Sequence, residues 1–216
     1  MKFSKGYLIT LEGGEGGGKT TQAVNLCERL KKIGKDVVIF REPGGTKISE
    51  QIRKVVLSAK NKNIAFTTEV LLFQAARAQI YNELVLPSMK AGKVVVMDRS
   101  RDSSVVYQGM VRGFGKKMIE QLNNISTSRT FPDLTLLLDV SVEKGLKRRE
   151  NSGIMNRLDM EAKNFHHKVR KAYLELAEED KSGRWYVINA SKSIEKVEEQ
   201  MWEVVLSCLT KINFDF

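Results

Sequence analysis

The sequence of 216 residues has few cysteines, no low-complexity stretch and no long apolar run, and each shortage excludes a class of protein. The two cysteines, Cys27 and Cys208, lie far apart with no CxxC or Cys/His ligand spacing, which argues against a disulfide framework or a cysteine metal site. No stretch approaches the roughly 18 to 20 uncharged apolar residues of a membrane-spanning helix, and no signal-peptide core forms near the N-terminus. We therefore expect a cytoplasmic protein with two buried thiols and no membrane partner.

The charge of the chain is unbalanced but not concentrated in one place. Lysine and arginine number 36 against 26 aspartates and glutamates, which gives a formal net charge of +10. The basic residues scatter along the chain instead of forming one stripe, and no recognisable nucleic-acid-binding motif accompanies them. Anionic small substrates explain the excess at least as well, so we expect no nucleic-acid partner.

Short apolar runs alternate with helical patterns along the chain. Runs rich in Val, Ile and Leu, which are typical of strands covered on both faces, occur at 7–11, 37–40, 94–98, 134–139 and 185–189. Helical patterns occur at 20–33, 48–57, 68–90, 115–127, 142–150, 161–181 and 193–210. This alternation predicts an α/β fold, a three-layer sandwich in which helices flank a five-stranded parallel sheet. We expect one domain over 1–216, with a short mobile lid at 150–157, "ENSGIMNR".

The stretch "LEGGEGGGKTT", residues 11–21, is built to hold phosphate. It contains the pattern G-x-x-x-x-G-K-[ST] after a predicted strand and at the start of a predicted helix, as the mechanism of a phosphate-binding loop requires. Backbone N–H groups and the helix N-terminus face the phosphates, Lys19 neutralises β/γ oxygens and Thr20 offers a hydroxyl to Mg²⁺. The predicted nucleoside triphosphate site comprises Gly13, Gly14, Glu15, Gly16, Gly17, Gly18, Lys19, Thr20 and Thr21.

Glu15 is the one acidic residue in this loop. A carboxylate that pointed at the triphosphate would repel it, at a cost of order 1 kcal/mol or more at a few ångströms. Glu15 therefore points elsewhere. Either it is solvated at the tip of the loop, or it accepts a hydrogen bond from a group that is not a phosphate.

Two aspartates follow predicted strands, where ligands of open α/β sheets bind. Asp98 is followed by Arg99, and this pair can hold a Mg²⁺ shell and bridge phosphoryl oxygens. Asp139 is followed by Val140 and no base. We favour Asp98, together with Thr20, for the metal.

Two further segments carry groups suited to a nucleotide. "FREPGGT", residues 40–46, combines an arginine with a Glu-Pro-Gly-Gly turn at a predicted strand end, which an ordinary turn would also explain. In "EVLLFQAARAQ", residues 69–79, Phe73 and Arg77 are four apart and share one helical face. An aromatic plane beside a guanidinium suits a base, although a core Phe beside a surface Arg would give the same pattern.

Six segments in series resemble bacterial thymidylate kinases: "EGGEGGGKTT", "FREPGGT", "LLFQAAR", "DRSRDSSVVYQG", "FPDLTLLLDV" and "NRLDMEA". The resemblance covers the chain from about residue 6 to about residue 205. It implies that the γ-phosphoryl group of ATP moves to dTMP with Mg²⁺ bound to ATP. It also implies a homodimer packed through long helices such as 68–90.

The resemblance also assigns residues to dTMP. Phe73 would stack on thymine, with Arg77, Gln108 and Ser104 at its polar edge. Tyr107 would crowd the 2′ position of the sugar. The implied dTMP site also includes Arg41, Arg53 and Arg99 as a clamp on the phosphate and Glu15 on the 3′-hydroxyl, and it makes the Glu42–Pro43 bond a candidate cis peptide.

No general base is needed, because the attacking oxygen belongs to an ionised phosphate and catalysis is alignment plus charge neutralisation. Beyond Lys19 and Arg99, a cation from the lid should cover the transferring group. Arg148, Arg149 and Arg157 are available, and we take Arg157 first and Arg149 second. Many relatives carry arginines within the lid, whereas this chain reads "ENSGIM" at residues 150–155.

Three other functions compete with this interpretation. Ser100 after Asp-Arg is similar to "DRS" of deoxynucleoside kinases, which makes such a kinase, or another nucleoside monophosphate kinase, the nearest alternative. A P-loop switch ATPase belongs to a different class, and no NKxD motif or partner domain supports it. A nucleotide-binding protein without activity is the third.

Overall fold

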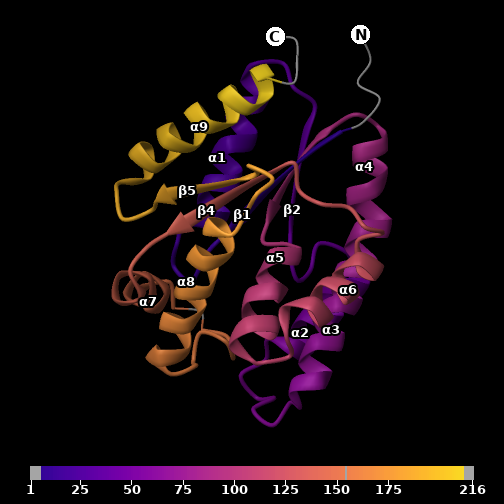
Figure 1. The fold of residues 1–216 in the computed structure, drawn as a ribbon, viewed down its shortest axis with the longest axis vertical. Coiled ribbons are helices and arrows are strands. Elements are labelled where there is room, and N and C mark those ends of the chain that lie inside the picture. Colours follow the sequence, from indigo (N-terminus) through magenta and orange to yellow (C-terminus); the bar gives the residue numbers. More distant parts are fainter. Residues whose placement is uncertain (1–5, 154, 212–216) are drawn as a thin grey trace.

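Five short strands of mainly Val, Ile and Leu form one parallel sheet at the centre of the molecule (Figure 1). The strands are β1 (Tyr7–Glu12), β2 (Val37–Arg41), β3 (Val94–Asp98), β4 (Leu134–Asp139) and β5 (Trp185–Asn189), in the order β2-β3-β1-β4-β5. The computed structural model describes residues 6–153 and 155–211. The predicted strands are confirmed, with β1 and β2 each one residue longer than expected, and so is the three-layer α/β sandwich.

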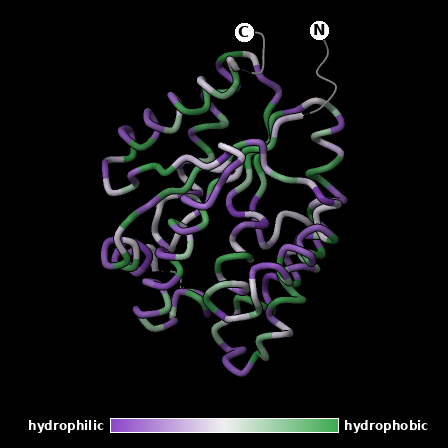
Figure 2. Tube along the Cα trace, in the orientation of Figure 1, coloured by the Kyte–Doolittle hydropathy of each residue, from purple (hydrophilic) through white to green (hydrophobic). Residues whose placement is uncertain are grey.

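Successive side chains of a strand pack into apolar cores on opposite sides of the sheet, because the side chains of a strand alternate between the two faces. Ile9 and Leu11 pack with α1 (Lys19–Lys32) and α9 (Ile194–Lys211) on one face. Leu8 packs on the other face. Helices therefore cover both faces, and Figure 2 shows mainly hydrophobic strands between helices in which hydrophobic and hydrophilic residues alternate. Cys27 is buried in the first core and Cys208 packs against it as a free thiol.

The remaining helical elements lie mainly on the second face of the sheet or at its carboxyl edge. They are α2 (Lys47–Val56), α3 (Phe66–Ile80), η1 (Tyr81–Val85), α4 (Leu86–Lys90), α5 (Arg101–Ser104), η2 (Val105–Val111), α6 (Lys116–Ser126), α7 (Val142–Asn151) and α8 (Lys163–Glu178). The expected helix 68–90 is one continuous helical run in which the π-helical turn η1 precedes Pro87, whose missing N–H a regular helix could not absorb. Among the described residues, no helix is long and apolar enough to cross a membrane.

One helical region was missed by the sequence patterns. Residues 101–111 form α5 and the π-helical segment η2 directly after β3. Val105 and Val106 have low helix propensity, but both are buried in a separate apolar cluster with Leu137 and Tyr173, so packing determines their conformation. π-Helical turns are frequent at functional sites, and η2 carries Tyr107 and Gln108.

The strand order brings the predicted functional loops to one edge of the sheet. β3 lies between β1 and β2, with Leu11 and Arg41 both in register with Asp98. The loop after β1, the turn after β2 and the turn after β3 are therefore neighbours. On the other side, β4 leads into α7, which ends at Asn151 at the start of the expected lid. Residue 154 of that lid lies outside the described residues.

Candidate active site

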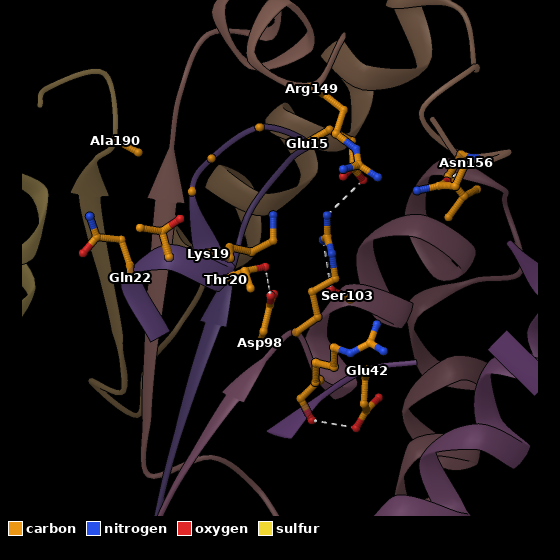
Figure 3. A pocket seen from close by; sticks show the side chains of 18 of the residues that line it. Glu15, Lys19, Thr20, Gln22, Glu42, Asp98, Ser103, Arg149, Asn156 and Ala190 are labelled. Carbon is orange, nitrogen blue, oxygen red and sulfur yellow. Dashed lines mark hydrogen bonds and ion pairs between the residues drawn. The ribbon is translucent and has the colours of Figure 1, made fainter. Parts of the chain in front are cut away.

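A cavity of about 920 Å³ opens at the carboxyl edge of the sheet (Figure 3). Its wall consists of the glycine loop after β1, the turns after β2 and β3, one face of α3, part of η2, the end of α7 with the start of the lid, and the loop after β5. Segments predicted separately to hold a triphosphate and a nucleotide base thus share one space.

Lys19 folds back over the glycine loop. Its Nζ donates hydrogen bonds to the carbonyl oxygens of Gly13 and Gly14 at 3.2 and 2.7 Å. The preceding residue, Gly18, has φ 84°, a left-handed conformation that favours glycine and lets α1 start directly under the loop. Burial and the neighbouring Arg99 guanidinium lower the pKa of Lys19 to about 8. The ammonium group is held where phosphate oxygens would meet it.

The two aspartates considered as metal ligands, Asp98 and Asp139, have different hydrogen-bond partners. Thr20 Oγ1 donates a hydrogen bond of 2.5 Å to Asp98 Oδ2 at the wall of the cavity (Figure 3). Asp139 instead receives two hydrogen bonds from Arg170, at 2.7 and 2.9 Å. Asp139 is therefore occupied by a bidentate ion pair, and Asp98 is the carboxylate that faces the triphosphate loop.

The donor set at Thr20 and Asp98 fits a hard cation. A hydroxyl and a carboxylate oxygen are the ligands that Mg²⁺ uses when substrate phosphates and water complete its shell. Among residues 6–153 and 155–211, no cluster of three or more His, Cys, Asp or Glu could hold a metal without such help. Thr20 and Asp98 would therefore hold such a cation only together with phosphate oxygens and water.

Glu15 points away from the phosphate-binding face of its loop. Its Oε1 accepts hydrogen bonds from Arg99 Nη2 and from the hydroxyl of Tyr107, each at 2.9 Å. Burial opposes ionisation of this carboxyl, but the charges of Arg99 and Lys19 prevail and lower the pKa of Glu15 to about 2. Of the two alternatives left open by the sequence, the structure shows the second, in which the carboxylate accepts hydrogen bonds.

The turn that carries Arg99 is held by a buried carboxylate, Glu12, that the sequence patterns did not reveal. Arg99 has φ 65°, and the turn continues through Ser100, whose N–H donates to Glu12 Oε1 at 2.8 Å. Glu12 Oε2 accepts from Ser103 Oγ at 2.6 Å and from the Tyr173 hydroxyl at 2.8 Å. Burial raises the pKa of Glu12 above that of an ordinary glutamate. The signal in the sequence was a glutamate that ends an otherwise apolar strand.

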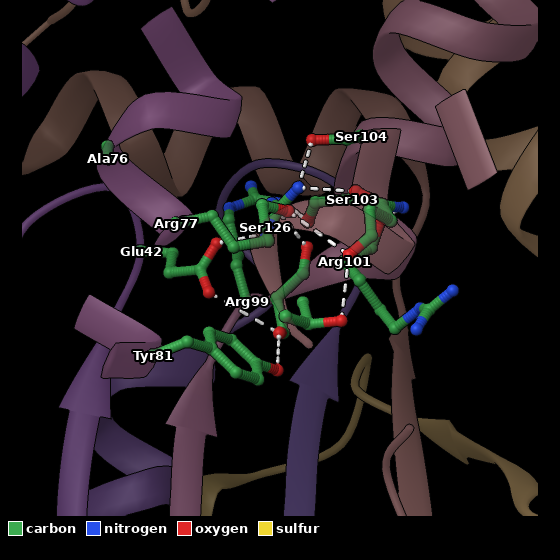
Figure 4. A network of polar contacts seen from close by, with 12 residues as sticks. Glu42, Ala76, Arg77, Tyr81, Arg99, Arg101, Ser103, Ser104 and Ser126 are labelled. Atoms are coloured by element: carbon green, nitrogen blue, oxygen red, sulfur yellow. Dashed lines mark hydrogen bonds and ion pairs between the residues drawn. The ribbon is translucent and has the colours of Figure 1, made fainter. Parts of the chain in front are cut away.

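Arg77 lies at the centre of a buried polar network (Figure 4). Its Nε donates to Glu42 Oε2 at 2.7 Å, and its Nη1 donates to Ser104 Oγ at 2.9 Å and to Asn123 Oδ1 at 2.7 Å. Its Nη2 donates to the carbonyl oxygen of Ser100 at 3.0 Å. The guanidinium is only 2 % exposed, which excludes the surface arginine that the helical pattern alone allowed.

The other residues assigned to the base are near Arg77 on the same wall. Phe73 lies one helical turn earlier on α3 and lines the cavity together with Ser104, Tyr107 and Gln108. Tyr107 and Gln108 come from η2, where the wide turn places consecutive side chains on the wall. The structure therefore brings an aromatic face and several hydrogen-bonding groups together.

Three arginines expected to clamp a phosphate line this cavity, namely Arg41, Arg53 and Arg99. Arg41 Nη2 is 2.7 Å from Glu50 Oε1, and Arg53 Nη1 donates to the carbonyl oxygen of Pro43 at 2.6 Å. Burial, with the neighbouring Arg41, lowers the pKa of Arg53. The Glu42–Pro43 bond is cis, as expected.

The three arginines considered as the lid cation lie in different surroundings. Arg149 lines the cavity (Figure 3). An ion pair with Asp159 at 3.0 Å holds its guanidinium. Arg148 donates to carbonyl oxygens of the glycine loop and of Ala190, at 3.4 and 3.0 Å. Arg157 does not line the cavity. The expectation that Arg157 is the catalytic lid cation is therefore not supported.

Arg157 has a structural environment instead. It is 9 % exposed, donates to the carbonyl oxygen of Val56 at 3.2 and 3.1 Å, and pairs with Glu69 Oε2 at 2.6 Å. All of these partners lie outside the triphosphate side of the cavity. The spacing of residues along the chain could not reveal these contacts, because they depend on how Arg157 packs against α2 and α3.

The glycine loop is packed tightly against α7. A Cβ atom added to Gly16 would lie 1.9 Å from the carbonyl oxygen of Gly145, and one added to Gly145 would lie 2.3 Å from the carbonyl oxygen of Glu15. Real Cβ atoms do not approach backbone atoms this closely. Two glycines thus allow the loop and the helix to touch backbone to backbone.

Comparison with known proteins agrees with this geometry. The family model for thymidylate kinase matches residues 11–201. Thymidylate kinases of Pelobacter propionicus and Halothermothrix orenii are 42% and 43% identical over 207 and 212 residues, which cover 93% and 96% of this chain and 94% and 100% of the relatives. The crystal structure of thymidylate kinase from Ehrlichia chaffeensis is similar with a TM-score of 0.76 and 30% identity, over 93% of this chain and 98% of that one. The chain belongs to the thymidylate kinase family and is an ATP-dependent nucleoside monophosphate kinase.

Proposed function

We propose that the chain transfers the γ-phosphoryl group of ATP to dTMP, giving dTDP and ADP. The observation that carries this proposal is the shared cavity, in which a triphosphate loop faces an aromatic residue and three arginines. Glu15 and Arg99 join the two halves at 2.9 Å. A second phosphate-binding half beside the first is what a phosphotransferase with a phosphorylated acceptor requires.

On the ATP side, the backbone of residues 13–18, the Lys19 ammonium and the Thr20 hydroxyl would bind the β- and γ-phosphates. Thr20 and Asp98 would hold Mg²⁺ directly or through water. When bound, the cation neutralises charge on the β- and γ-phosphate oxygens. Arg148 lies between the glycine loop and Ala190, where the outer part of the nucleotide would pass.

On the acceptor side, Phe73 would stack on thymine and Arg77 and Gln108 would bind its polar edge. Arg41, Arg53 and Arg99 would bind the phosphate, which offers them three anionic acceptors. Tyr107 would leave little room at the 2′ position of the sugar. Glu15, whose Oε1 holds Arg99 and Tyr107, would bind the 3′-hydroxyl through its other oxygen.

In the transfer step, a phosphate oxygen of dTMP bonds to the γ-phosphorus and the bond from that phosphorus to the β–γ bridging oxygen breaks. ADP leaves with the electron pair of that bond. No proton has to be removed, so the role of the protein is alignment and charge neutralisation. Lys19 and Arg99 would act from the carboxyl edge of the sheet, and Arg149, which also lines the cavity, would act from the end of α7.

The arginines discriminate against a nucleoside acceptor. A nucleoside would bring no phosphate to Arg41, Arg53 and Arg99, whereas a monophosphate would gain charge-assisted hydrogen bonds from these three arginines, which line the cavity. A switch ATPase would likewise have no use for the buried Arg77 network. These observations favour a monophosphate acceptor.

A homodimer is part of the proposal. Three large apolar side chains on neighbouring helices are exposed, namely Leu71 of α3 at 55%, Met118 of α6 at 52% and Ile125 of α6 at 78%. A second copy that covers this surface would bury them. Sedimentation would test it, since a monomer at micromolar concentration contradicts the homodimer. The cytoplasmic location expected from the sequence stays a prediction.

The decisive experiment measures ADP release with dTMP, dUMP, thymidine and dCMP as acceptors. We expect dTMP to be preferred and ADP release without acceptor to be slow. Lys19→Ala should lower turnover by about 10³-fold or more with the fold intact. Equal or better turnover of thymidine would refute the monophosphate acceptor, and acceptor-independent hydrolysis stimulated by protein or DNA would favour a switch.

A further inference from the structure

Glu69 is a fully buried carboxylate to which the proposed mechanism gives no role. It belongs to the first turn of α3 and has 0% exposure. Its Oε1 accepts a hydrogen bond of 2.8 Å from Gln108 Nε2. Its Oε2 pairs with Arg157 Nη2 at 2.6 Å and lies 3.6 Å from Arg112 Nη2. The Glu69 carboxylate thus contacts Gln108, which lines the cavity, and two arginines that do not line it.

This contact fixes which way the Gln108 amide faces. An amide has a donor end and an acceptor end, whereas an ionised carboxylate accepts only. If the Gln108 side chain turned over, its carbonyl oxygen would meet the Glu69 oxygen with no proton between them. Gln108 Nε2 therefore stays on Glu69, and its Oε1 is left for the cavity that Gln108 lines. Among the described residues, no donor is within hydrogen-bonding distance of Gln108 Oε1.

On the same wall, Arg77 offers a hydrogen-bond donor, whereas Gln108 offers an acceptor. A guanidinium has five N–H groups. Four of them donate to Glu42, Ser104, Asn123 and the carbonyl oxygen of Ser100 (Figure 4). Within the described part of the chain, one N–H on Nη2 has no acceptor. The wall therefore offers one acceptor, Gln108 Oε1, and one donor, Arg77 Nη2.

Only some pyrimidines match this pair. Thymine and uracil carry an N–H at position 3 next to a carbonyl at position 4, which is a donor beside an acceptor. Cytosine carries the reverse, an acceptor at position 3 and an amino group at position 4. Cytosine would place its N3 lone pair against Gln108 Oε1 and its amino group against the Arg77 guanidinium. A site built to hydrogen-bond one pattern rejects the other strongly, because its polar groups are then unpaired.

Building on the proposed function, we propose that Glu69 is a positioning residue that determines base specificity. By holding the Gln108 amide in one orientation, it makes the site select pyrimidines with an N–H at position 3 and exclude cytosine. Glu69 does not contact the substrate. Its ion pair with Arg157 offsets the cost of burying the charge, which gives that buried arginine a structural purpose remote from phosphoryl transfer.

The test compares acceptors in Glu69→Gln. A glutamine at this position can donate its own amide to Gln108 Oε1, so the Gln108 amide is free to turn over. We expect the ratio of kcat/KM for dTMP to kcat/KM for dCMP to fall by about tenfold or more. The ratio for dTMP to dUMP should stay unchanged, because thymine and uracil carry the same imide. A merely structural role for Glu69 would lower all three values together.

Arg157→Met is the matched control. It breaks the same ion pair but leaves the carboxylate on Gln108, so the dTMP-to-dCMP ratio should stay close to that of the unmodified enzyme even if stability falls. Gln108→Leu covers the case in which Glu69→Gln does not fold, because it removes the amide without touching the ion pairs. Its dTMP-to-dCMP ratio should fall as well.

The results of these measurements distinguish a positioning role of Glu69 from a structural one. An unchanged ratio in Glu69→Gln, or in Gln108→Leu, overturns the positioning role. An equal fall of the ratio in Arg157→Met and Glu69→Gln also overturns it, since the effect would then follow the ion pair and not the amide. If the unmodified enzyme does not phosphorylate dTMP at all, the proposed function fails and not only the role of Glu69.

Discussion

The carboxylate of Glu15 and the guanidinium of Arg99 form an ion pair of 2.9 Å between the glycine loop and the turn after β3. Both side chains are mostly buried, with 14% and 17% exposure. A pair in this position keeps the negative charge of Glu15 away from the triphosphate and orients Arg99 toward the acceptor side. The loop that binds one substrate thereby organises the site of the other.

Replacement of Glu15 should affect dTMP and not ATP. In Glu15→Gln the side chain keeps its size but loses the charge that holds Arg99, so kcat/KM for dTMP should fall by about 10- to 100-fold, equivalent to roughly 1.4 to 2.8 kcal/mol. The KM for ATP should change by less than about threefold. Steady-state kinetics with each substrate varied in turn measure both. Unaltered kinetics with dTMP would mean that Glu15 has no role in acceptor binding.

The two lid-associated arginines should differ in kind when replaced by alanine. Arg149→Ala should lower kcat by about 10³-fold, because a cation over the transferring group is lost. Arg157→Ala should instead lower the free energy of unfolding by about 3 kcal/mol, because Glu69 loses its closest partner in a buried site. Single-turnover kinetics and thermal unfolding, measured on both variants, distinguish the roles. A large loss of kcat at normal stability in Arg157→Ala would restore the assignment favoured by the sequence.

ATP binding should weaken in alkaline solution. The pKa of Lys19 in the free enzyme is lowered to about 8, so above pH 8 the ammonium loses its proton and the loop loses its positive charge. The Kd for a non-hydrolysable ATP analogue should therefore be constant below pH 8 and rise about tenfold per pH unit above it. Titrations between pH 6.5 and 9.5 at constant ionic strength measure this. Lys19→Arg, whose guanidinium stays charged over this range, is the control and should show no such rise.

Replacement of the two aspartates at strand ends should have different effects, on the Mg²⁺ requirement for Asp98 and on stability for Asp139. Asp98→Asn should raise the Mg²⁺ concentration for half-maximal activity by about tenfold, because a carboxylate ligand becomes a neutral amide. Asp139→Asn should leave that concentration unchanged and lower the Tm by a few degrees through loss of the ion pair with Arg170, on the order of 1 kcal/mol. A raised Mg²⁺ requirement in Asp139→Asn alone would contradict the placement of the metal at Asp98.

Much of this site follows from the sequence because of where parallel strands end. The apolar runs at 94–98 and 134–139 predict their strands to the residue, and any polar residue at their carboxyl ends must reach the same edge of the sheet. Lys19, Thr20, Asp98 and Arg99 could be predicted for this reason. The sequence also favoured Asp98 over Asp139, and the structure adds that Asp139 pairs with Arg170, a residue distant in sequence.

What could not be predicted depends on the direction of side chains. Glu12 and Glu69 are buried glutamates, and composition gives no reason to place a glutamate inside a protein. Their partners come from α8, η2 and the last residue of the expected lid, so the contacts exist only after those elements pack. The sequence could not show for the same reason that the side chain of Arg157 turns toward Glu69 instead of lining the cavity.

The contact between Gly16 and Gly145 decides which parts of the enzyme can move independently. Because the two backbones touch with no side chain between them, the glycine loop cannot shift toward α7, and α7 cannot approach the loop. Loop and helix form one wall up to Asn151, where the helix ends. If the segment predicted as a mobile lid closes over ATP, its hinge would therefore lie beyond that residue. Two missing side chains, far from the reacting atoms, thus set the boundary between the fixed part of the active site and its cover.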